Sequence, residues 1–319
     1  MANGKEMKEL FCRYEGNPIL TPEMWPVQYP WPLAAVFNPG ATKLNDEVLL
    51  LVRTESREGY SSLTIAKSAD GKTNWKISER PTLLADRNSG EEFFGLEDPR
   101  ITWIEERKEY IIVYVSFRVG MAGWVPSISL ISTKDFISFE RLVGPRLIPP
   151  NKDAALFPRT IRGRYALIHR PFIDGRADIW VSFSPNLRDW GADQVLIPAQ
   201  KEGWDSDRVG IGPPPIETEE GWITFYHGVE KTISGRVYRV GVALLDLETL
   251  EIIRRSPVWI FGPKEDYEMR ENNGGVVFPC GNVVNEKTDE IFMYYGAADK
   301  TVGLSIASLK EILNFLKSC

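Results

Sequence analysis

The chain has few cysteines, few histidines and no long apolar run, and each shortage excludes a class of protein. Its 319 residues include three cysteines and two histidines. Neither residue type recurs at the spacing of a metal site, and an odd number of cysteines argues against a disulfide framework. The strongest apolar run, residues 48–52, is far shorter than the ~18 residues of a membrane-spanning helix. We therefore expect no metal and no membrane partner.

Charge gives no sign of a nucleic-acid partner. The 44 acidic side chains outnumber the 38 basic ones, which leaves a net charge of −6, and no long Lys/Arg run is present. Residues 1–10 are polar and lack the apolar stretch of a secretory signal. The 43% of hydrophobic and 26% of charged residues are typical of a globular protein. We expect a folded, cytoplasmic protein that binds no nucleic acid.

Most of the chain has the pattern of β-strands. Short runs of β-branched and aromatic residues alternate with turn-forming Gly, Pro, Asn and Asp; they lie at residues 48–53, 110–117, 165–169, 179–183, 222–226, 237–245 and 291–295. Helical periodicity appears only at the end, where Leu309, Ile312, Leu313 and Leu316 fall on one face. The sequence predicts an all-β protein with a helical tail at about residues 308–319.

A weak repeat indicates how the strands are grouped. Three segments have Ser or Thr, then Asp or Asn two residues later, then an aromatic residue: they begin at Ser68, Thr133 and Ser184. Residues 242–247 and 304–308 are candidate degenerate copies. Units of about 60 residues fit four-stranded blades, and five of them use nearly the whole chain. We expect one five-bladed β-propeller domain over residues 1–319, with a large β-sandwich as the alternative.

Chemistry-bearing side chains gather where several strands begin or end. The clusters are residues 95–101, 151–158, 222–228 and 294–299, and each taken alone could be a solvated turn. Adjacent residues of an extended chain point to opposite faces, so we expect Glu97 and Asp98 to do different work. Aromatic rings with acids and amides suit a sugar, and Arg, Lys and His suit an anion. Neither a nucleotide-binding glycine fingerprint nor a serine nucleophile elbow is present, so no cofactor is expected.

Several of these motifs occur in an order that resembles a known family. They are Asn38-Pro39-Gly40-Ala41, residues 51–53, residues 95–101, residues 151–158, His169-Arg170, residues 221–228 and residues 294–299. Together they resemble the β-mannoside phosphorylases of glycoside hydrolase family 130, over about residues 17–299. The resemblance implies a five-bladed β-propeller and a hexosyl-transferring enzyme. A β-mannoside and inorganic phosphate would give α-mannose 1-phosphate and a shortened acceptor, with inversion.

The resemblance also assigns roles to residues. Asp98 matches the single catalytic acid, which is thought to protonate the glycosidic oxygen through the 3-hydroxyl of the mannose; donation needs a raised pKa or a bound state that favours the neutral form. Arg100 is then expected to face away from the Asp98 carboxyl. The resemblance implies that phosphate is bound by Arg53, Lys152, Arg170, His227 and Tyr226, with Arg118 as a weaker candidate. It implies that the mannose is bound by Asn38, Asp153, Asp299 and Tyr295. Glu97 could orient Arg100 or contact the sugar.

For the part of the site that binds the acceptor sugar, no motif of this sequence matches one of the family. This part depends on loops such as residues 121–126 and 205–209, so β-1,4-mannooligosaccharide is the first choice of substrate, with β-1,2-mannobiose, mannosyl-glucose and mannosyl-N-acetylglucosamine open. A phosphate-independent mannosidase and a non-catalytic sugar-binding propeller are the alternatives. Homo-oligomers are common in the family, although the sequence does not set a number of subunits.

Overall fold

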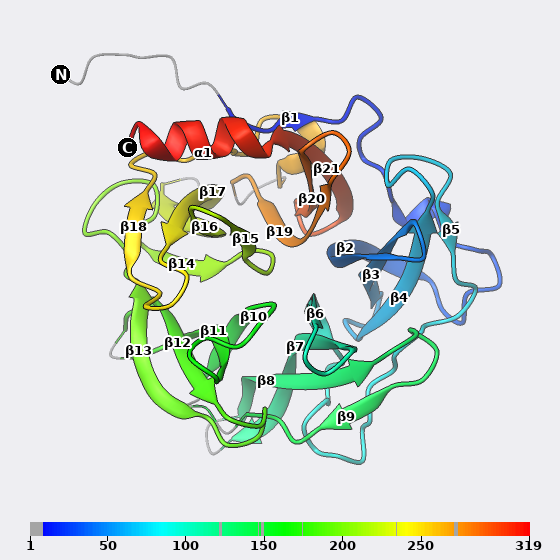
Figure 1. Ribbon diagram of the computed structural model, residues 1–319. Helices are drawn as coiled ribbons and strands as arrows, with labels where there is room; N and C mark the ends of the chain where they lie inside the picture. The colour runs from blue at the N-terminus through cyan, green and yellow to red at the C-terminus, as the bar shows by residue number, and fades with distance from the viewer. Residues whose placement is uncertain are drawn as a thin grey trace.

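The computed structural model describes residues 9–120, 123–145, 147, 150–173, 175–233, 235–270 and 274–319. Five sheets stand around a central axis like the blades of a propeller (Figure 1), so the predicted fold class is confirmed. Blade 1 contains β2 (Leu33–Leu44), β3 (Glu47–Ser56), β4 (Ser61–Ser68) and β5 (Lys76–Ile77), and blade 2 contains β6 (Glu97–Ile104), β7 (Glu109–Gly120), β8 (Gly123–Thr133) and β9 (Glu140–Leu142). Blade 3 contains β10 (Asn151–Leu156), β11 (Tyr165–Pro171), β12 (Ile179–Ser184) and β13 (Gly191–Ile197).

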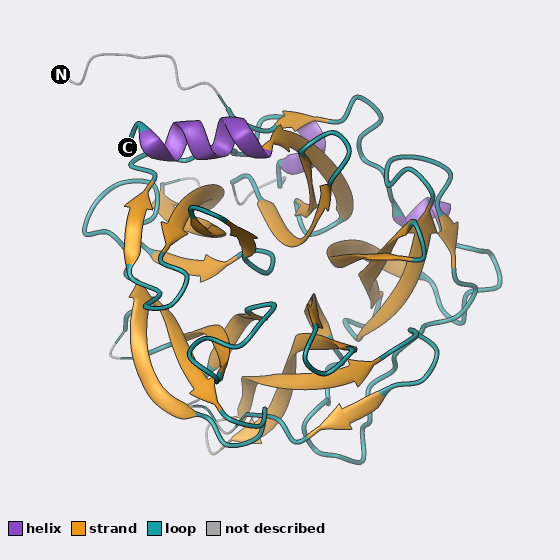
Figure 2. Cartoon of the chain, in the orientation of Figure 1, coloured by secondary structure: helices purple, strands orange, loops and turns teal. Residues whose placement is uncertain are grey.

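The last two blades complete the ring. Blade 4 contains β14 (Arg208–Ile211), β16 (Gly221–Thr232), β17 (Gly235–Leu245) and β18 (Ile252–Arg255), and β15 (Ile216–Thr218) pairs with β16. Blade 5 contains β19 (Val277–Asn285), β20 (Glu290–Ala297), β21 (Thr301–Ser308) and β1 (Cys12–Arg13). Because β1 supplies the outer strand of blade 5, a segment near the N-terminus closes the ring. Helix α1 (Leu309–Lys317) follows β21 along the rim (Figure 2), close to its predicted bounds; two short 3₁₀ turns lie at Pro22–Met24 and Asp266–Glu268.

The repeat seen in the sequence marks the end of the third strand in each blade. Ser68, Thr133 and Ser184 end β4, β8 and β12, and each hydroxyl accepts a backbone N–H two or three residues later. In blade 4 the carboxylate of Asp246 accepts two such N–H groups just after β17. In blade 5 Ser308 instead caps α1 by accepting the N–H of Glu311. One local chemistry, a side-chain oxygen that accepts nearby backbone N–H groups, therefore recurs at the end of the third strand of every blade.

The hydrophobic core is divided into layers between neighbouring blades. Alternate residues of a strand pack into different layers: Leu49 and Leu51 lie between blades 1 and 2, whereas Leu50 and Val52 lie between blades 5 and 1. Both faces of each blade are thus covered, which is why the strands appear in the sequence as continuous apolar runs. The innermost strands leave the axis itself to polar side chains.

Candidate active site

Three innermost strands carry a bulge that turns an acid or amide toward the axis. Asn38, Asp98 and Asp153 have φ of 46°, 49° and 51°, and the strand register slips at each of them. Asn and Asp tolerate this left-handed conformation better than other side chains do. A bulge also ends strict alternation, so Glu97 and Asp98 line the same cavity. The expectation that they point to opposite faces is wrong for this reason.

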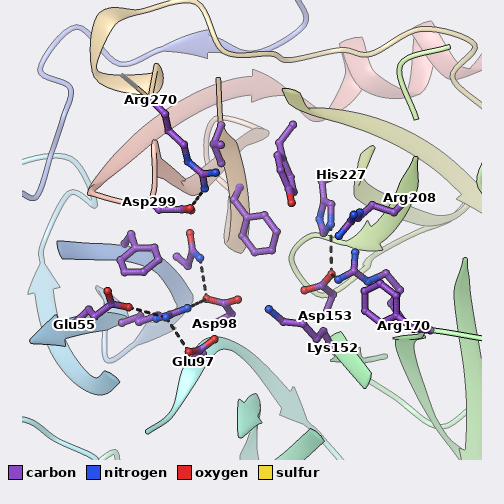
Figure 3. A pocket seen from close by; sticks show the side chains of 17 residues that line it. Glu55, Glu97, Asp98, Lys152, Asp153, Arg170, Arg208, His227, Arg270 and Asp299 are labelled. Carbon is purple, nitrogen blue, oxygen red and sulfur yellow. Dashed lines mark hydrogen bonds and ion pairs between the residues drawn. The ribbon is translucent and has the colours of Figure 1, made fainter. Parts of the chain in front are cut away.

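These bulges surround a cavity of about 400 Å³ on the axis (Figure 3). Most of the residues expected at the site line it, namely Asp98, Arg53, Lys152, Arg170, His227, Asn38, Asp153 and Asp299. Other lining residues were not singled out from the sequence: Phe37, Glu55, Phe172, Arg208, Tyr238, Arg270, Val276 and Phe278. Of these, Phe278 carried a weak signal: like Asn38 and Asp98 it directly precedes a proline, and a fourth register slip follows it between Pro279 and Gly281.

Three other candidates lie outside the cavity. Tyr226 precedes His227 in β16 and therefore points the other way, where its hydroxyl accepts a bond from Arg255 at 3.0 Å. Tyr295 is buried between blades 4 and 5, and its hydroxyl donates to Glu268 at 2.7 Å. Arg118 borders a separate hollow on blade 2. The structure gives these three side chains no contact with the cavity.

One side of the cavity holds carboxylates gathered on Arg53. Its guanidinium donates to Glu55 at 2.8 Å, to Glu97 at 2.9 Å and to Asp98 at 3.1 Å. Asn38 donates a further bond to the same Asp98 oxygen at 2.8 Å. The two terminal nitrogens of Arg53 are thus bonded to carboxylates, Asp98 among them, and are not free to bind phosphate in this arrangement.

Asp98 and Glu97 have opposite pKa shifts. Burial disfavours the charge of Asp98, but the cationic Arg53, Lys152 and Arg100 and the bond from Asn38 outweigh it and hold the pKa of this carboxyl below its usual value. Burial raises the pKa of Glu97, against the attraction of Arg53. Of the two conditions given for proton donation, a raised pKa or a bound state that favours the neutral form, the first is therefore not met by Asp98. Arg100 does face away from the carboxyl, because it donates to three backbone carbonyls.

The opposite side of the cavity is cationic. Lys152, Arg170, Arg208 and His227 converge there around Asp153 (Figure 3). Asp153 lies 3.0 Å from Arg170 and 3.4 Å from Nε2 of His227, and Arg170, after the opposing effect of burial, holds the pKa of Asp153 well below its usual value.

This side also contains buried polar atoms that form no hydrogen bond with the described residues. Nε of Arg170 and Nδ1 of His227 are buried and have no hydrogen-bond partner among the described residues. Burial lowers the pKa of His227, so near neutral pH its ring is neutral, and its single N–H belongs on Nε2, which faces the Asp153 carboxylate at 3.4 Å. Nδ1 is then an acceptor, and Nε of Arg170 is the unpaired donor. Buried donors are rarely left unpaired, so this donor indicates a ligand that accepts a hydrogen bond.

Aromatic rings and one ion pair complete the wall. Phe278 packs on the ring of His227 with centroids 4.6 Å apart, and Tyr238 lies 5.9 Å from that ring. Arg270 forms an ion pair with Asp299. Within the described ranges, no group of three or more His, Cys, Asp or Glu is placed to hold a metal, and no helix there is long and apolar enough to cross a membrane.

The second histidine has a structural role that predicts acid sensitivity. His169 is buried within hydrogen-bond distance of Ser182 and Asn151, and burial lowers its pKa to about 4, against the attraction of Asp193. An unfolded histidine titrates near pH 6.5, so between pH 6.5 and 4 the unfolded chain binds a proton that the folded chain does not. We expect His169 to remove about 3 kcal/mol of stability across this window as the pH falls.

Urea denaturation at pH 7 and pH 4.5 measures this effect. The His169→Gln variant keeps a side chain that can form hydrogen bonds and should lose less stability between the two pH values than the native chain. His227, whose pKa is also lowered, is unchanged in both proteins. Equal losses would contradict the assignment to His169.

The fold and the cavity define a five-bladed propeller whose axial cavity has carboxylates gathered around Arg53 on one side and cationic side chains on the other. Residues 11–318 match the family model described as beta-1,4-mannooligosaccharide phosphorylase. The chain belongs to glycoside hydrolase family 130, as the motifs in its sequence implied.

Curated relatives cover nearly the whole chain. It is 36% identical over 308 residues to the 1,2-beta-oligomannan phosphorylase of Thermoanaerobacter sp. (strain X514), spanning 94% of this chain and 98% of that one. Identity to the beta-1,4-mannooligosaccharide phosphorylase of Ruminococcus albus is 30% over 325 residues, or 98% and 92% of the two chains. The solved beta-1,2-mannobiose phosphorylase of Listeria innocua, in complex with beta-1,2-mannobiose, superposes with a TM-score of 0.84 at 31% identity, covering 97% and 99%.

Proposed function

We propose that this chain catalyses the inverting phosphorolysis of β-mannosides. A phosphate oxygen attacks the anomeric carbon, the glycosidic C–O bond breaks, and Asp98 supplies the proton that the departing oxygen needs. The products are α-mannose 1-phosphate and a shortened acceptor. The 3-hydroxyl of the mannose would relay the proton, as the family resemblance implies, with Asn38, Asp153 and Asp299 bonding the other hydroxyls.

The observation that carries this proposal is the pairing of the carboxylates. An inverting hydrolase needs a second carboxylate to activate water. Among the described residues that line the cavity, every carboxylate forms an ion pair: Glu55, Glu97 and Asp98 with Arg53, Asp153 with Arg170, and Asp299 with Arg270. None of them is therefore free to act as a base toward water. The side of the cavity opposite Asp98, where a base would have to lie, is lined by the cationic Lys152, Arg170 and Arg208. An anionic nucleophile needs no base, and charge-assisted bonds would hold it in line with the leaving oxygen.

The comparisons support β-mannosides and favour one linkage. The relatives named for β-1,2-mannosides are 36% and 33% identical to this chain, whereas the one named for β-1,4-mannooligosaccharides is 30% identical. We therefore propose β-1,2-mannosides ahead of the β-1,4-mannooligosaccharides that the sequence put first. Inorganic phosphate is the co-substrate and no cofactor takes part. A cytoplasmic setting suits this chemistry, because phosphate is abundant there and a phosphorylated sugar is retained.

Product analysis tests the proposal. The protein is incubated with β-1,2-mannobiose or β-1,4-mannobiose in phosphate, or in sulfate at equal ionic strength, and products are followed by ³¹P and ¹H NMR. We expect α-mannose 1-phosphate in phosphate alone, because sulfate cannot act as the nucleophile. Free mannose at a phosphate-independent rate would identify a hydrolase. Binding of the disaccharides without any product would leave a sugar-binding propeller.

A further inference from the structure

A group of aromatic rings lies near the cavity and has no part in the chemistry above. Phe93 and Trp124 are stacked with centroids 4.0 Å apart and an interplanar angle of 20°. Phe94 contacts both of them edge-on, and Phe117 packs against Phe94. Phe93 is 39% exposed and Trp124 is 40% exposed. We call Phe93, Phe94, Phe117 and Trp124 the aromatic platform.

The chain connects this platform directly to the cavity. Residues 93–98 run between blades 1 and 2: Phe93 donates its N–H to the carbonyl of Phe117, and Ser61 donates its N–H to that of Phe94. The same segment then enters β6 with Glu97 and Asp98. Four extended residues span at most about 14 Å, so Phe93 lies within that distance of Glu97. The second or third ring of an acceptor whose first ring sits beside Asp98 can span this gap.

The backbone on both sides of Phe93 and Phe94 is fixed by buried contacts of Glu92 and Gly95. Glu92 is buried, and its carboxylate accepts bonds from Tyr114 at 2.5 Å, from Arg141 at 2.9 and 3.0 Å, and from the N–H of Asp86 at 2.6 Å. Gly95, with φ of +111°, fixes the other end, because a Cβ there would meet the backbone of Ser61 at 1.9 Å. Anchors on both sides of Phe93 and Phe94 pre-organise exposed rings, as a binding surface requires.

We propose that the aromatic platform is a distal acceptor subsite, on which a sugar ring of a mannooligosaccharide stacks against Trp124. The inference rests on the proposed function and extends it from disaccharides to longer chains. A saccharide suits the surface because the C–H face of a pyranose packs flat on an exposed aromatic ring. It also suits the position, because residues 93–98 lead directly from the platform to Asp98 at the cavity.

Chain length and a matched tryptophan pair test this proposal. Trp124→Ala removes the outer ring, and Trp103→Ala is the control because Trp103 is 37% exposed in the same blade, at the far end of β6. We expect Trp124→Ala to lower kcat/KM for β-1,2-mannotetraose about tenfold and to leave that for mannobiose within twofold. Trp103→Ala should change neither. An equal change for both substrates, or no change, would overturn the subsite.

Two further measurements separate this inference from other outcomes. Calorimetric titration with mannotetraose compares native protein and Trp124→Ala without turnover, so the platform is tested even if no mannoside is phosphorolysed and the proposed function fails. Unchanged affinity would then overturn the subsite by itself. Light scattering reports the oligomeric state, and dissociation caused by Trp124→Ala would assign the platform to a protein contact instead.

Discussion

Replacing Asp98 by asparagine should lower kcat for mannobiose phosphorolysis by at least about 10³-fold, which is within the range of a lost general acid. Asparagine has nearly the same shape, and its carbonyl can still accept the bonds that Asn38 and Arg53 now donate to Asp98. The fold should therefore survive, and the phosphate side of the cavity is not altered. Steady-state rates, with phosphate affinity measured separately, check this expectation.

Glu97→Gln is the matched control for this variant. Glu97 neighbours Asp98, lines the same cavity and binds the same Arg53. Burial also raises its pKa, so in the free protein it holds a proton more readily than Asp98 does. We expect a much smaller loss of kcat in this variant. A loss as large as that of Asp98→Asn would move the proton donor to Glu97.

An activated substrate distinguishes acid catalysis from mere damage. The leaving group of 4-nitrophenyl β-mannoside departs without protonation, so Asp98→Asn should recover most of the native rate on it if the lost function is proton donation. A variant that is equally impaired on both substrates would show that Asp98 positions the sugar or the phosphate and donates no proton.

The low pKa of Asp98 has a consequence for the order of events. An acid whose pKa is held below its usual value has to gain its proton before the glycosidic bond breaks. Phosphate bound beside Lys152 would offset the cations that now stabilise the carboxylate, and would thereby raise the pKa of Asp98. The nucleophile would then help to prepare the acid, so that both reactants are in place before bond cleavage.

The period of the fold could be predicted because it depends on local chemistry. A Ser or Thr hydroxyl followed by Asp or Asn satisfies a turn within one short segment, and this pattern is visible at Ser68, Thr133 and Ser184 without any tertiary information. The closure of blade 5 by β1 joins residues 12–13 to residues 305–306. No local pattern indicates a contact so distant in the chain.

The site was predicted less completely, for identifiable reasons. Strict alternation fails at Asp98 because of the bulge, whereas it correctly explains why Tyr226 points away from its neighbour His227. Arg208 and Arg270 reach the cavity from segments with no motif around them. Their side chains become neighbours of Lys152 only once the blades are assembled around the axis.

Lys152 gives the prediction with the clearest dependence on phosphate. Loss of one charge-assisted bond to the anion costs about 1.5–3 kcal/mol, so Lys152→Met should raise KM for phosphate by roughly 10- to 100-fold, measured from initial rates at constant ionic strength. The same change removes a cation that lowers the pKa of Asp98 in the free protein, so the acid keeps its proton to higher pH and the alkaline limb of the kcat/KM profile, which reports the free enzyme, moves upward. Lys134→Met, at an exposed turn after β8, should change neither quantity. An unaltered KM for phosphate with Lys152→Met would remove Lys152 from the anion site, and a downward shift of the alkaline limb would contradict its effect on Asp98.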